Sequence, residues 1–151
     1  MDITAPIIAG HSLAGITLGT SVEPVLAQAY QQGRKVDLQV FHYATIDLHS
    51  YKIDQGVVTV NADAAGTIVS LSCQQPYQGT YQNKIWPGMS ITQIIAVSQK
   101  QMLLHGSLVV DAEFGVCFDV PYPYDEYDYV HELPKDLVLD KLYVKNNNWW
   151  R

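Results

Sequence analysis

The order of hydrophobic and polar positions predicts two helices, each followed by strands. Apolar residues recur at helical spacing over 22–32 and again over 91–103. Pro24 lies in the first turn of the first stretch, where its missing N–H group has no helical partner to lose. Gly33 directly follows that stretch, in the position where helix C-termini favour glycine. We therefore expect helices over 22–32 and 91–103.

Glycine and serine precede both predicted helices at matching positions. Gly19 and Gly88 allow a turn that other residues resist, and Ser21 and Ser90 are suited to act as N-caps. Gln93 stands three residues after Ser90 and completes the pattern of a capping box. A capped turn is therefore expected before each helix.

Strand-like stretches follow each predicted helix and are separated by turn residues. The turns at 54–56 and 63–66 are rich in Asp, Gln and Gly. The predicted strands are 36–48, 50–54, 57–62 and 67–73 after the first helix, and 107–111, 116–120 and 141–145 after the second.

An internal similarity supports a duplicated organisation. Residues 16–26 align with 85–95 at an offset of 69, and Ile, Gly and Ser coincide. We predict an α+β fold over 1–151 as a single domain. Its two halves, about 1–78 and 79–151, would each be a helix followed by an antiparallel meander. Together they would share a two-layer core of helices on a sheet.

The helix-then-meander duplication, opened by a G-x-S turn, resembles the repeat of the beta-lactamase inhibitory protein superfamily. The resemblance covers the eleven-residue motif in each half. The chain lacks the cysteine pairs of that inhibitor. The resemblance therefore implies an architecture and assigns no binding residues.

Composition favours a folded protein with a basic partner. The hydrophobic fraction is 48% and the charged fraction 16%, which places the chain outside the disordered class. The formal net charge is −6, and most of the acidic residues lie in the C-terminal third. This balance disfavours direct binding of nucleic acid, which requires cationic surface. A protein partner, if present, should be basic.

The chain carries no pattern of a membrane span or a secretory signal. Asp2 is the only charged residue before Glu23, so the basic start of a secretory signal is lacking, and no apolar run reaches the ~18 residues of a span. Cys73 and Cys117 lie in apolar strand-like runs without a CxxC spacing. We expect two reduced, buried thiols, a cytoplasmic protein and no membrane association.

The candidate catalytic and metal-binding residues are scattered. None of the five histidines has a partner at HxH, HxxxH or HExxH spacing. We expect a protein that is not an enzyme, with no catalytic residues, metal or cofactor. Two alternatives stay open. One is a small metal-dependent or cysteine hydrolase with a site made from His42, His49 and Cys117, and the other is a structural or ligand-binding module of a bacterial assembly.

Residues 121–130, with the sequence PYPYDEYDYV, form an acidic and aromatic segment that we call the tyrosine segment. Its two prolines restrict the residues before them to extended conformations and prevent regular strand pairing. Its tyrosines cannot all be buried beside three carboxylates, because an unpaired charge in a core costs several kcal/mol. We expect some rings to face solvent as contact residues. In the alternative, Tyr122, Tyr127 and Tyr129 cover the sheet edge as a lid.

The run DAEFGVCFDVPYPYDEYDYV at 111–130, followed by ELPKDLVLDKLYV and paired tryptophans, resembles small cytosolic immunity proteins encoded beside bacterial polymorphic and contact-dependent toxins. The resemblance implies a protein that binds and neutralises a cognate toxin domain, expected to be a basic nuclease. It leaves open the oligomeric state and whether Trp149 and Trp150 are docked or exposed. The residues expected to bind the toxin are Asp111, Glu113, Tyr122, Tyr124, Asp125, Glu126, Tyr127, Asp128 and Tyr129.

Overall fold

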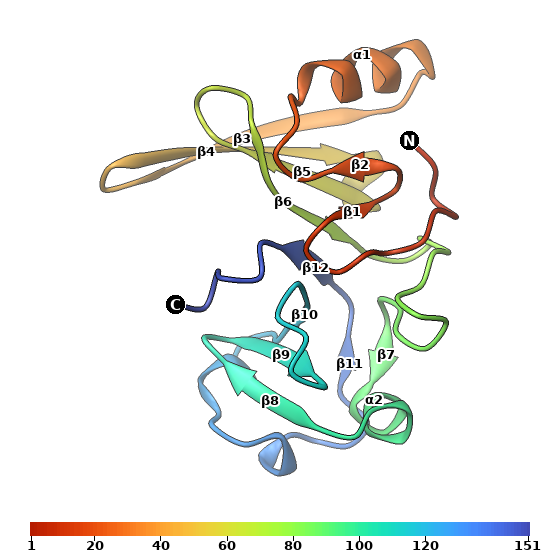
Figure 1. The fold of residues 1–151 in the computed structure, drawn as a ribbon, viewed down its shortest axis with the longest axis vertical. Helices are drawn as coiled ribbons and strands as arrows, with labels where there is room; N and C mark the ends of the chain where they lie inside the picture. Colours follow the sequence, from red (N-terminus) through yellow and green to blue (C-terminus); the bar gives the residue numbers. More distant parts are fainter.

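The computed structural model describes residues 1–151 and shows an α+β protein with two helices on a large antiparallel sheet (Figure 1). The helices are α1 (Glu23–Gln31) and α2 (Ile91–Val97), and three short 3₁₀ turns are η1 (Asp54–Gly56), η2 (Tyr124–Glu126) and η3 (Val130–Glu132). The strands are β1 (Ser12–Leu13), β2 (Ile16–Thr17), β3 (Val36–Tyr43), β4 (Ile46–Ile53), β5 (Val58–Ala62), β6 (Ile68–Cys73), β7 (Met89–Ser90), β8 (Gln101–Leu104), β9 (Ser107–Val110), β10 (Val116–Asp119), β11 (Val138–Leu139) and β12 (Leu142–Lys145).

The main sheet has eight strands in the order β3-β4-β5-β6-β12-β10-β9-β8, and every neighbouring pair is antiparallel. Strands β6 and β12 pair in the middle, so early and late parts of the chain contribute to one sheet. Strands β3 and β8 form its two edges. Pairs β1-β2 and β7-β11 form two small separate sheets. Neither helix has the length and hydropathy needed to cross a membrane.

The two faces of the main sheet differ in character because side chains alternate along each strand. One face is apolar and belongs to a buried cluster that includes Val60, Leu71 and Val144, with Leu13 of β1 and Ile94 of α2 packed in the same cluster. The other face carries small polar residues in its central strands.

Helix α1 agrees with the predicted helix to within one residue at each end. Gly33 follows it with φ +69°, in the left-handed region where glycine is favoured. The expected N-cap is wrong by one residue, since Val22 occupies that position. Ser21 still helps to begin the helix, because its Oγ accepts a hydrogen bond of 3.2 Å from the N–H of Glu23.

Helix α2 is shorter than predicted. The capping box at its start is confirmed, with Ser90 and Gln93 exchanging hydrogen bonds. The expected end near residue 103 is wrong, because the helix ends at Val97 and residues 101–104 form strand β8. Ser98 adopts an extended backbone, and its hydroxyl donates a 2.6 Å hydrogen bond to the carbonyl of Ile94. That bond satisfies a carbonyl of the last helical turn.

The predicted strand over 36–48 is wrong in one respect, because it is two strands of a hairpin. Strands β3 and β4 pair from Val36↔Ile53 to Tyr43↔Ile46, with residues 44–45 as the connection. Ala44 and Thr45 lack the Asn or Gly that marks most two-residue turns, so the pattern gave no signal there. The predicted strands 57–62, 67–73, 107–111, 116–120 and 141–145 agree with β5, β6, β9, β10 and β12 to within one residue at each end.

Candidate functional site

The tyrosine segment lies on the surface, as expected from its charges. Three of its rings are exposed: Tyr122 by 86%, Tyr129 by 62% and Tyr127 by 39%. Tyr124 is half-buried and packs against the core cluster. The lid alternative is therefore wrong for Tyr122 and Tyr129, whose side chains keep most of their accessible surface, whereas Tyr127 is partly covered and contacts Tyr124. Tyr124 and Val130 anchor the segment against the core cluster.

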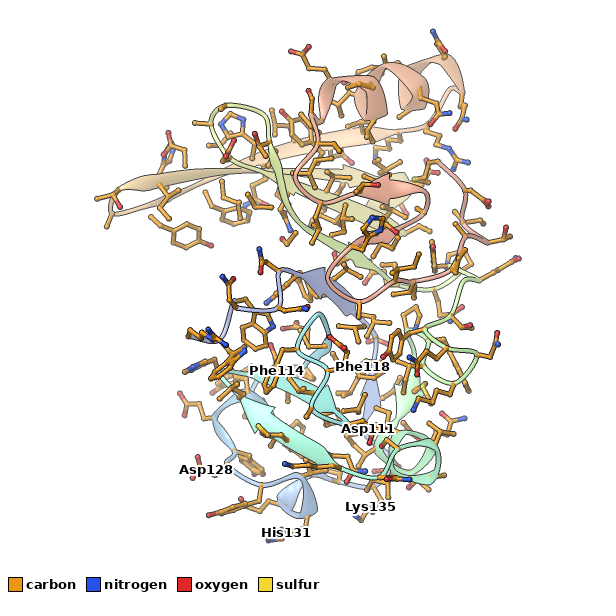
Figure 2. All side chains as sticks on the ribbon, viewed as in Figure 1. Asp111, Phe114, Phe118, Asp128, His131 and Lys135 are labelled. Atoms are coloured by element: carbon orange, nitrogen blue, oxygen red, sulfur yellow. The ribbon has the colours of Figure 1, made fainter.

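The carboxylates of the tyrosine segment are free of internal ion pairs. Asp125, Glu126 and Asp128 are all exposed, and the ion pairs of the protein lie elsewhere. Figure 2 shows Asp128 at the outer margin of the molecule. These charges keep their full solvation, and their field is available to a binding partner.

Internal contacts order the tyrosine rings. Tyr124 and Tyr127 meet edge to face with ring centroids 5.6 Å apart. Tyr129 stacks on His131 at 5.5 Å, and the N–H of Tyr129 donates a 3.0 Å hydrogen bond to the Glu132 carboxylate. Rings that are already positioned lose less conformational entropy when they become buried in an interface.

The tyrosine segment begins at one end of the β8–β9 hairpin. The N–H of Val120 donates a 3.0 Å hydrogen bond to the carbonyl of Gly106, and Asp125 lies against that glycine. Residues of η3 then contact edge strand β8. Part of that edge is therefore covered, which protects it from pairing with another chain.

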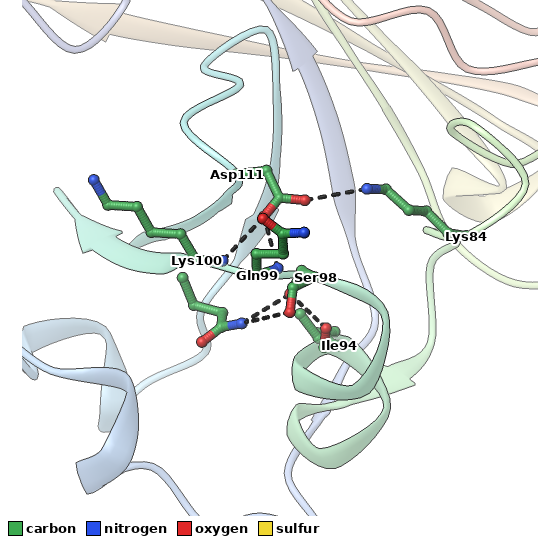
Figure 3. A network of polar contacts seen from close by, with 7 residues as sticks. Lys84, Ile94, Ser98, Gln99, Lys100 and Asp111 are labelled. Atoms are coloured by element: carbon green, nitrogen blue, oxygen red, sulfur yellow. Dashed lines mark hydrogen bonds and ion pairs between the residues drawn. The ribbon is translucent and has the colours of Figure 1, made fainter.

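Asp111 and Glu113, also expected in the binding surface, lie elsewhere. Asp111 Oδ1 accepts hydrogen bonds from the N–H groups of Gln99 and Lys100 at 2.8 and 3.0 Å, and Oδ2 pairs with Lys84 Nζ at 3.1 Å (Figure 3). Lys100 precedes β8, whereas Gly106 follows it. Strand β8 therefore lies between Asp111 and the start of the tyrosine segment.

The side chain of Glu113 is also engaged, because its Oε1 accepts a 2.9 Å hydrogen bond from the N–H of Gly115. Asp111 and Glu113 are therefore both used in local contacts, and a role for them in binding a toxin stays a prediction. Both carboxylates shape local backbone. Asp111 in particular fixes the turn that ends α2 and begins β8.

Asp111→Asn should lower the free energy of unfolding by about 1 kcal/mol at pH 7, since it removes the charge from three hydrogen bonds at an exposed site. Hydrogen bonds from the backbone of Lys100 and Gln99, and then from Lys84, lower the pKa of Asp111. Its stabilisation is therefore present above the unfolded pKa near 3.8 and is lost as pH falls through the folded value.

Urea denaturation of both proteins at pH 7 and pH 3 tests this expectation. The difference between wild type and Asp111→Asn should shrink at the lower pH. Asp136→Asn, at an exposed carboxylate without an ion pair, is the matched control and should change stability by less than about 0.5 kcal/mol. Equal stability of the two variants at pH 7 would contradict the assigned role.

A second surface is a groove of about 410 Å³ on the polar face of the main sheet. Its floor contains Ser50, Thr59, Asn61 and Ser107, which are buried although no layer of helices or strands covers this face. Longer side chains form the rim and give the groove its depth. We call this surface the lysine groove, for the three lysines that line it.

The lysine groove is cationic within an acidic protein. Lys52, Lys141 and Lys145 line it, and Asp119 is its one carboxylate. None of the three lysines makes an ion pair. Burial raises the pKa of Asp119, and Lys141 and Lys145 oppose that rise.

Aromatic rings hold the lysine side chains in place. Lys145 Nζ lies 4.8 Å from the ring centroid of Tyr143 and 4.7 Å from that of Trp149, and Lys141 Nζ lies 5.9 Å from the Tyr143 ring. These are cation–π distances. Burial raises the pKa of Tyr143 to about 12, so its hydroxyl stays neutral at physiological pH.

The paired tryptophans at the C-terminus are docked. Trp149 Nε1 donates a 2.5 Å hydrogen bond to the carbonyl of Phe114, and the Trp150 ring stacks on Phe114 with centroids 4.8 Å apart. Figure 2 shows Phe114 beside the C-terminal segment. The C-terminal segment thereby reaches the lysine groove, where Trp149 contacts the groove residue Lys145.

His42, His49 and Cys117 are not brought together. His42 Nδ1 lies 2.7 Å from Asp47 Oδ1 in the exposed β3–β4 hairpin. His49 in β4 and Cys117 in β10 are four strands apart, about 19 Å, and point to opposite faces of the sheet. Burial raises the pKa of Cys117, which disfavours the thiolate. No group of three metal-ligating side chains is present. A hydrolase site made from these three residues is therefore not assembled.

Strand alternation was the one signal in the sequence that could have indicated the lysine groove. Polar residues occupy every second position in several consecutive strands, as in Ser50-x-Lys52, Thr59-x-Asn61 and Lys141-x-Tyr143-x-Lys145. Such alternation predicts one polar face for each strand. Which strands are neighbours, however, is a property of the folded sheet.

Comparison with known proteins gives a fold and no function. No protein-family model matches the chain, and no curated protein sequence matches it. The crystal structure of the uncharacterized protein yfeY from Escherichia coli is similar, with a TM-score of 0.59 and 10% sequence identity. The similarity covers 91% of this chain and 95% of the other. At this identity the likeness concerns the arrangement of helices and strands alone.

Proposed function

We propose that this protein is a non-catalytic cytoplasmic immunity protein that binds and neutralises a basic toxin domain through the tyrosine segment. The observation that carries the proposal is one surface combining three exposed tyrosines with three carboxylates that have no internal ion pair. A nuclease domain fits best as the target, because its substrate groove must attract phosphates.

The energetics favour a protein partner. Tyrosines are enriched among interface hot spots because a rigid ring with a polar tip contributes large contact area at small entropic cost. Exposed carboxylates accelerate encounter with a cationic surface and disfavour acidic partners. The net charge of −6 adds long-range attraction to such a partner.

In the proposed mechanism, Asp125, Glu126 and Asp128 occupy positions on the toxin that substrate phosphates otherwise take. Tyr122 and Tyr129 pack beside these carboxylates and exclude water from the contact. Inhibition then requires no chemistry from this protein, because the toxin's own cationic groove is blocked.

We also infer that the fold consists of two fused helix-and-meander halves, 1–78 and 79–151, within a single domain. The sheet order supports this, since β3 to β6 run inward from one edge and β8, β9, β10 and β12 run inward from the other. The final strands of the two halves meet at the centre. Hydrogen bonds from the N–H groups of Gln78 and Gly79 to the carbonyl of Ile3 tie the junction to the N-terminus.

Co-expression with the product of the adjacent toxin gene, followed by titration of the purified proteins, tests the function. The double variant Asp125→Lys/Asp128→Lys should weaken binding between tenfold and a hundredfold, through lost attraction and new repulsion. Tyr122→Ala should weaken it by about tenfold, as expected for a contact tyrosine. The loss of affinity in Asp125→Lys/Asp128→Lys should be greatest at low salt.

Asp136→Lys/Asp140→Lys is the matched control. It changes the net charge equally at two exposed carboxylates outside the tyrosine segment and should alter affinity by less than about threefold. The proposal fails if no complex forms with the neighbouring toxin. It fails for this surface if both double variants weaken binding equally.

A further inference from the structure

We propose that the lysine groove is a binding site for a small phosphorylated molecule with a planar ring, the class to which nucleoside monophosphates belong. This inference goes beyond the proposed function and does not depend on it, because the groove lies on the polar face of the main sheet and the tyrosine segment lies outside it, next to edge strand β8.

Charge is the first argument for an anionic ligand. Lys52, Lys141 and Lys145 bring three positive charges to a groove with one carboxylate, in a chain with nine basic and fifteen acidic residues. None of the three has an ion-pair partner, so no protein carboxylate must be displaced before an anion binds. Lysine ammonium groups are common ligands of phosphate.

The register of the strands places hydrogen-bonding groups in a row on the floor. Ser50 pairs with Asn61, Asn61 with Ser70, and Ser70 with Lys145, so these four side chains cross β4, β5, β6 and β12 on one face. Asn61 Nδ2 donates a 2.9 Å hydrogen bond to Ser70 Oγ, which orients the amide. The remaining hydroxyl and amide groups can bond to a ligand's ring edges or hydroxyls.

Aromatic side chains on two sides of the groove favour a planar ring. Phe41 and Tyr43 line one side, with their ring planes 20° apart and centroids separated by 6.3 Å. Tyr143 also lines the groove, and Trp149 lies against the ammonium group of the groove residue Lys145. Nucleobases stack on such rings whatever their sequence, because every base has a π face.

Size and overall charge favour a small ligand over a polymer. A volume of about 410 Å³ lies within the range of small-molecule sites. A long nucleic acid would extend past the three lysines onto acidic surface, including Asp125 of the tyrosine segment. That contact would repel its phosphates, whereas a single phosphate group could stay beside the three lysines, with Asp119 as the one opposing charge.

Titration of the full chain with adenosine monophosphate, followed by calorimetry and amide NMR, tests the proposal. Saturable binding should shift the amide signals of Ser70, Ser107 and Lys145. Adenosine and inorganic phosphate, added separately, should each bind at least tenfold more weakly, because each satisfies only one part of the site. Lys141→Met/Lys145→Met should weaken adenosine monophosphate binding at least tenfold.

Two control variants make the outcome decisive. Lys35→Met/Lys135→Met makes the same charge change outside the groove and should alter affinity by less than twofold. Asp119→Asn removes the one carboxylate of the groove and should tighten binding severalfold, which a misfolded variant would not do. The proposal is overturned if adenosine monophosphate does not bind saturably, or if the two lysine double variants lose affinity equally. It is also overturned if oligonucleotides bind more tightly than the monophosphate, with affinity that rises with their length.

Discussion

Gly115→Ala is expected to destabilise the protein by about 3 kcal/mol, the upper range for inserting an atom into a packed site. A Cβ atom at this position would collide with the backbone N of Gly10 and with Asn147 Oδ1, and would lie 2.8 Å from the carbonyl carbon of Ala9. The Asn147 side chain can move aside. The backbone of residues 9 and 10 cannot move without disturbing the N-terminal hairpin.

Hydrogen bonds hold these backbones together. The carbonyl of Gly115 accepts a 2.9 Å bond from the N–H of Gly10 and a 3.2 Å bond from the N–H of Lys145. Gly115 therefore joins the N-terminal segment to the end of β12. Because Lys145 lines the lysine groove, this variant should also weaken ligand binding there, and the loss should follow the loss of folded protein.

Gly33→Ala is the control for the general effect of replacing glycine. Gly33 has φ +69° and no atom near its absent Cβ, so only backbone strain opposes the change, at about 1 kcal/mol. Denaturant titration of both variants measures the difference. A Gly115→Ala protein no less stable than Gly33→Ala would show that the close approach at residues 9 and 10 relaxes freely.

The elements that could be predicted from the sequence are those whose signals are local. Helix α1 has its C-terminal glycine at Gly33, and the capping box of Ser90 and Gln93 spans only three residues. Strands β5 and β6 are apolar runs bounded by turn residues. Such signals need no knowledge of the rest of the fold, which is why these elements were placed to within one residue.

The predicted elements differ from the structure where residues distant in sequence determine the local conformation. The end of α2 depends on Asp111, which binds the N–H groups of Gln99 and Lys100 from more than ten residues away. Residues 101–104 have helical apolar spacing but form strand β8, because all four residues pair with residues of β9. Tertiary pairing thus overrides a local helical preference.

The two candidate surfaces also differ in whether a local signal in the sequence predicts them. Exposure of the tyrosine segment followed from the cost of burying its own charges, so the sequence was sufficient. The lysine groove depends on the central pairing of Ser70 with Lys145, residues 75 positions apart. Their proximity is a consequence of sheet order, which the local pattern does not contain.

Tyr77→Phe is expected to lower the free energy of unfolding by about 2 kcal/mol, because it leaves one buried and one partly buried backbone group without their partner. The buried Tyr77 hydroxyl donates a 2.7 Å hydrogen bond to the carbonyl of Ala5 and accepts a 2.8 Å bond from the N–H of Ala14. It therefore fastens both ends of residues 5–14 to the rest of the protein.

The pH dependence of Tyr77→Phe gives a second measurement. Burial raises the pKa of Tyr77 to about 12, so the folded protein keeps the phenol neutral after unfolded chains begin to ionise near pH 10. The wild type should therefore lose stability as pH rises from 10 towards 12. The phenylalanine variant lacks this contribution, and the stability difference between the two proteins should narrow over that range.

Tyr81→Phe is the matched control, since the Tyr81 ring is also buried but its hydroxyl reaches solvent and makes no hydrogen bond within the protein. Removal of the Tyr81 hydroxyl should change the free energy of unfolding by less than about 0.5 kcal/mol. Amide hydrogen exchange should locate the difference, with faster exchange at Ala14 in Tyr77→Phe and unchanged exchange in Tyr81→Phe. If both variants were equally stable, the Tyr77 hydroxyl would not be what fastens the N-terminal segment, and backbone hydrogen bonds such as Ile7 to Thr80 and Gly10 to Gly115 would hold it instead.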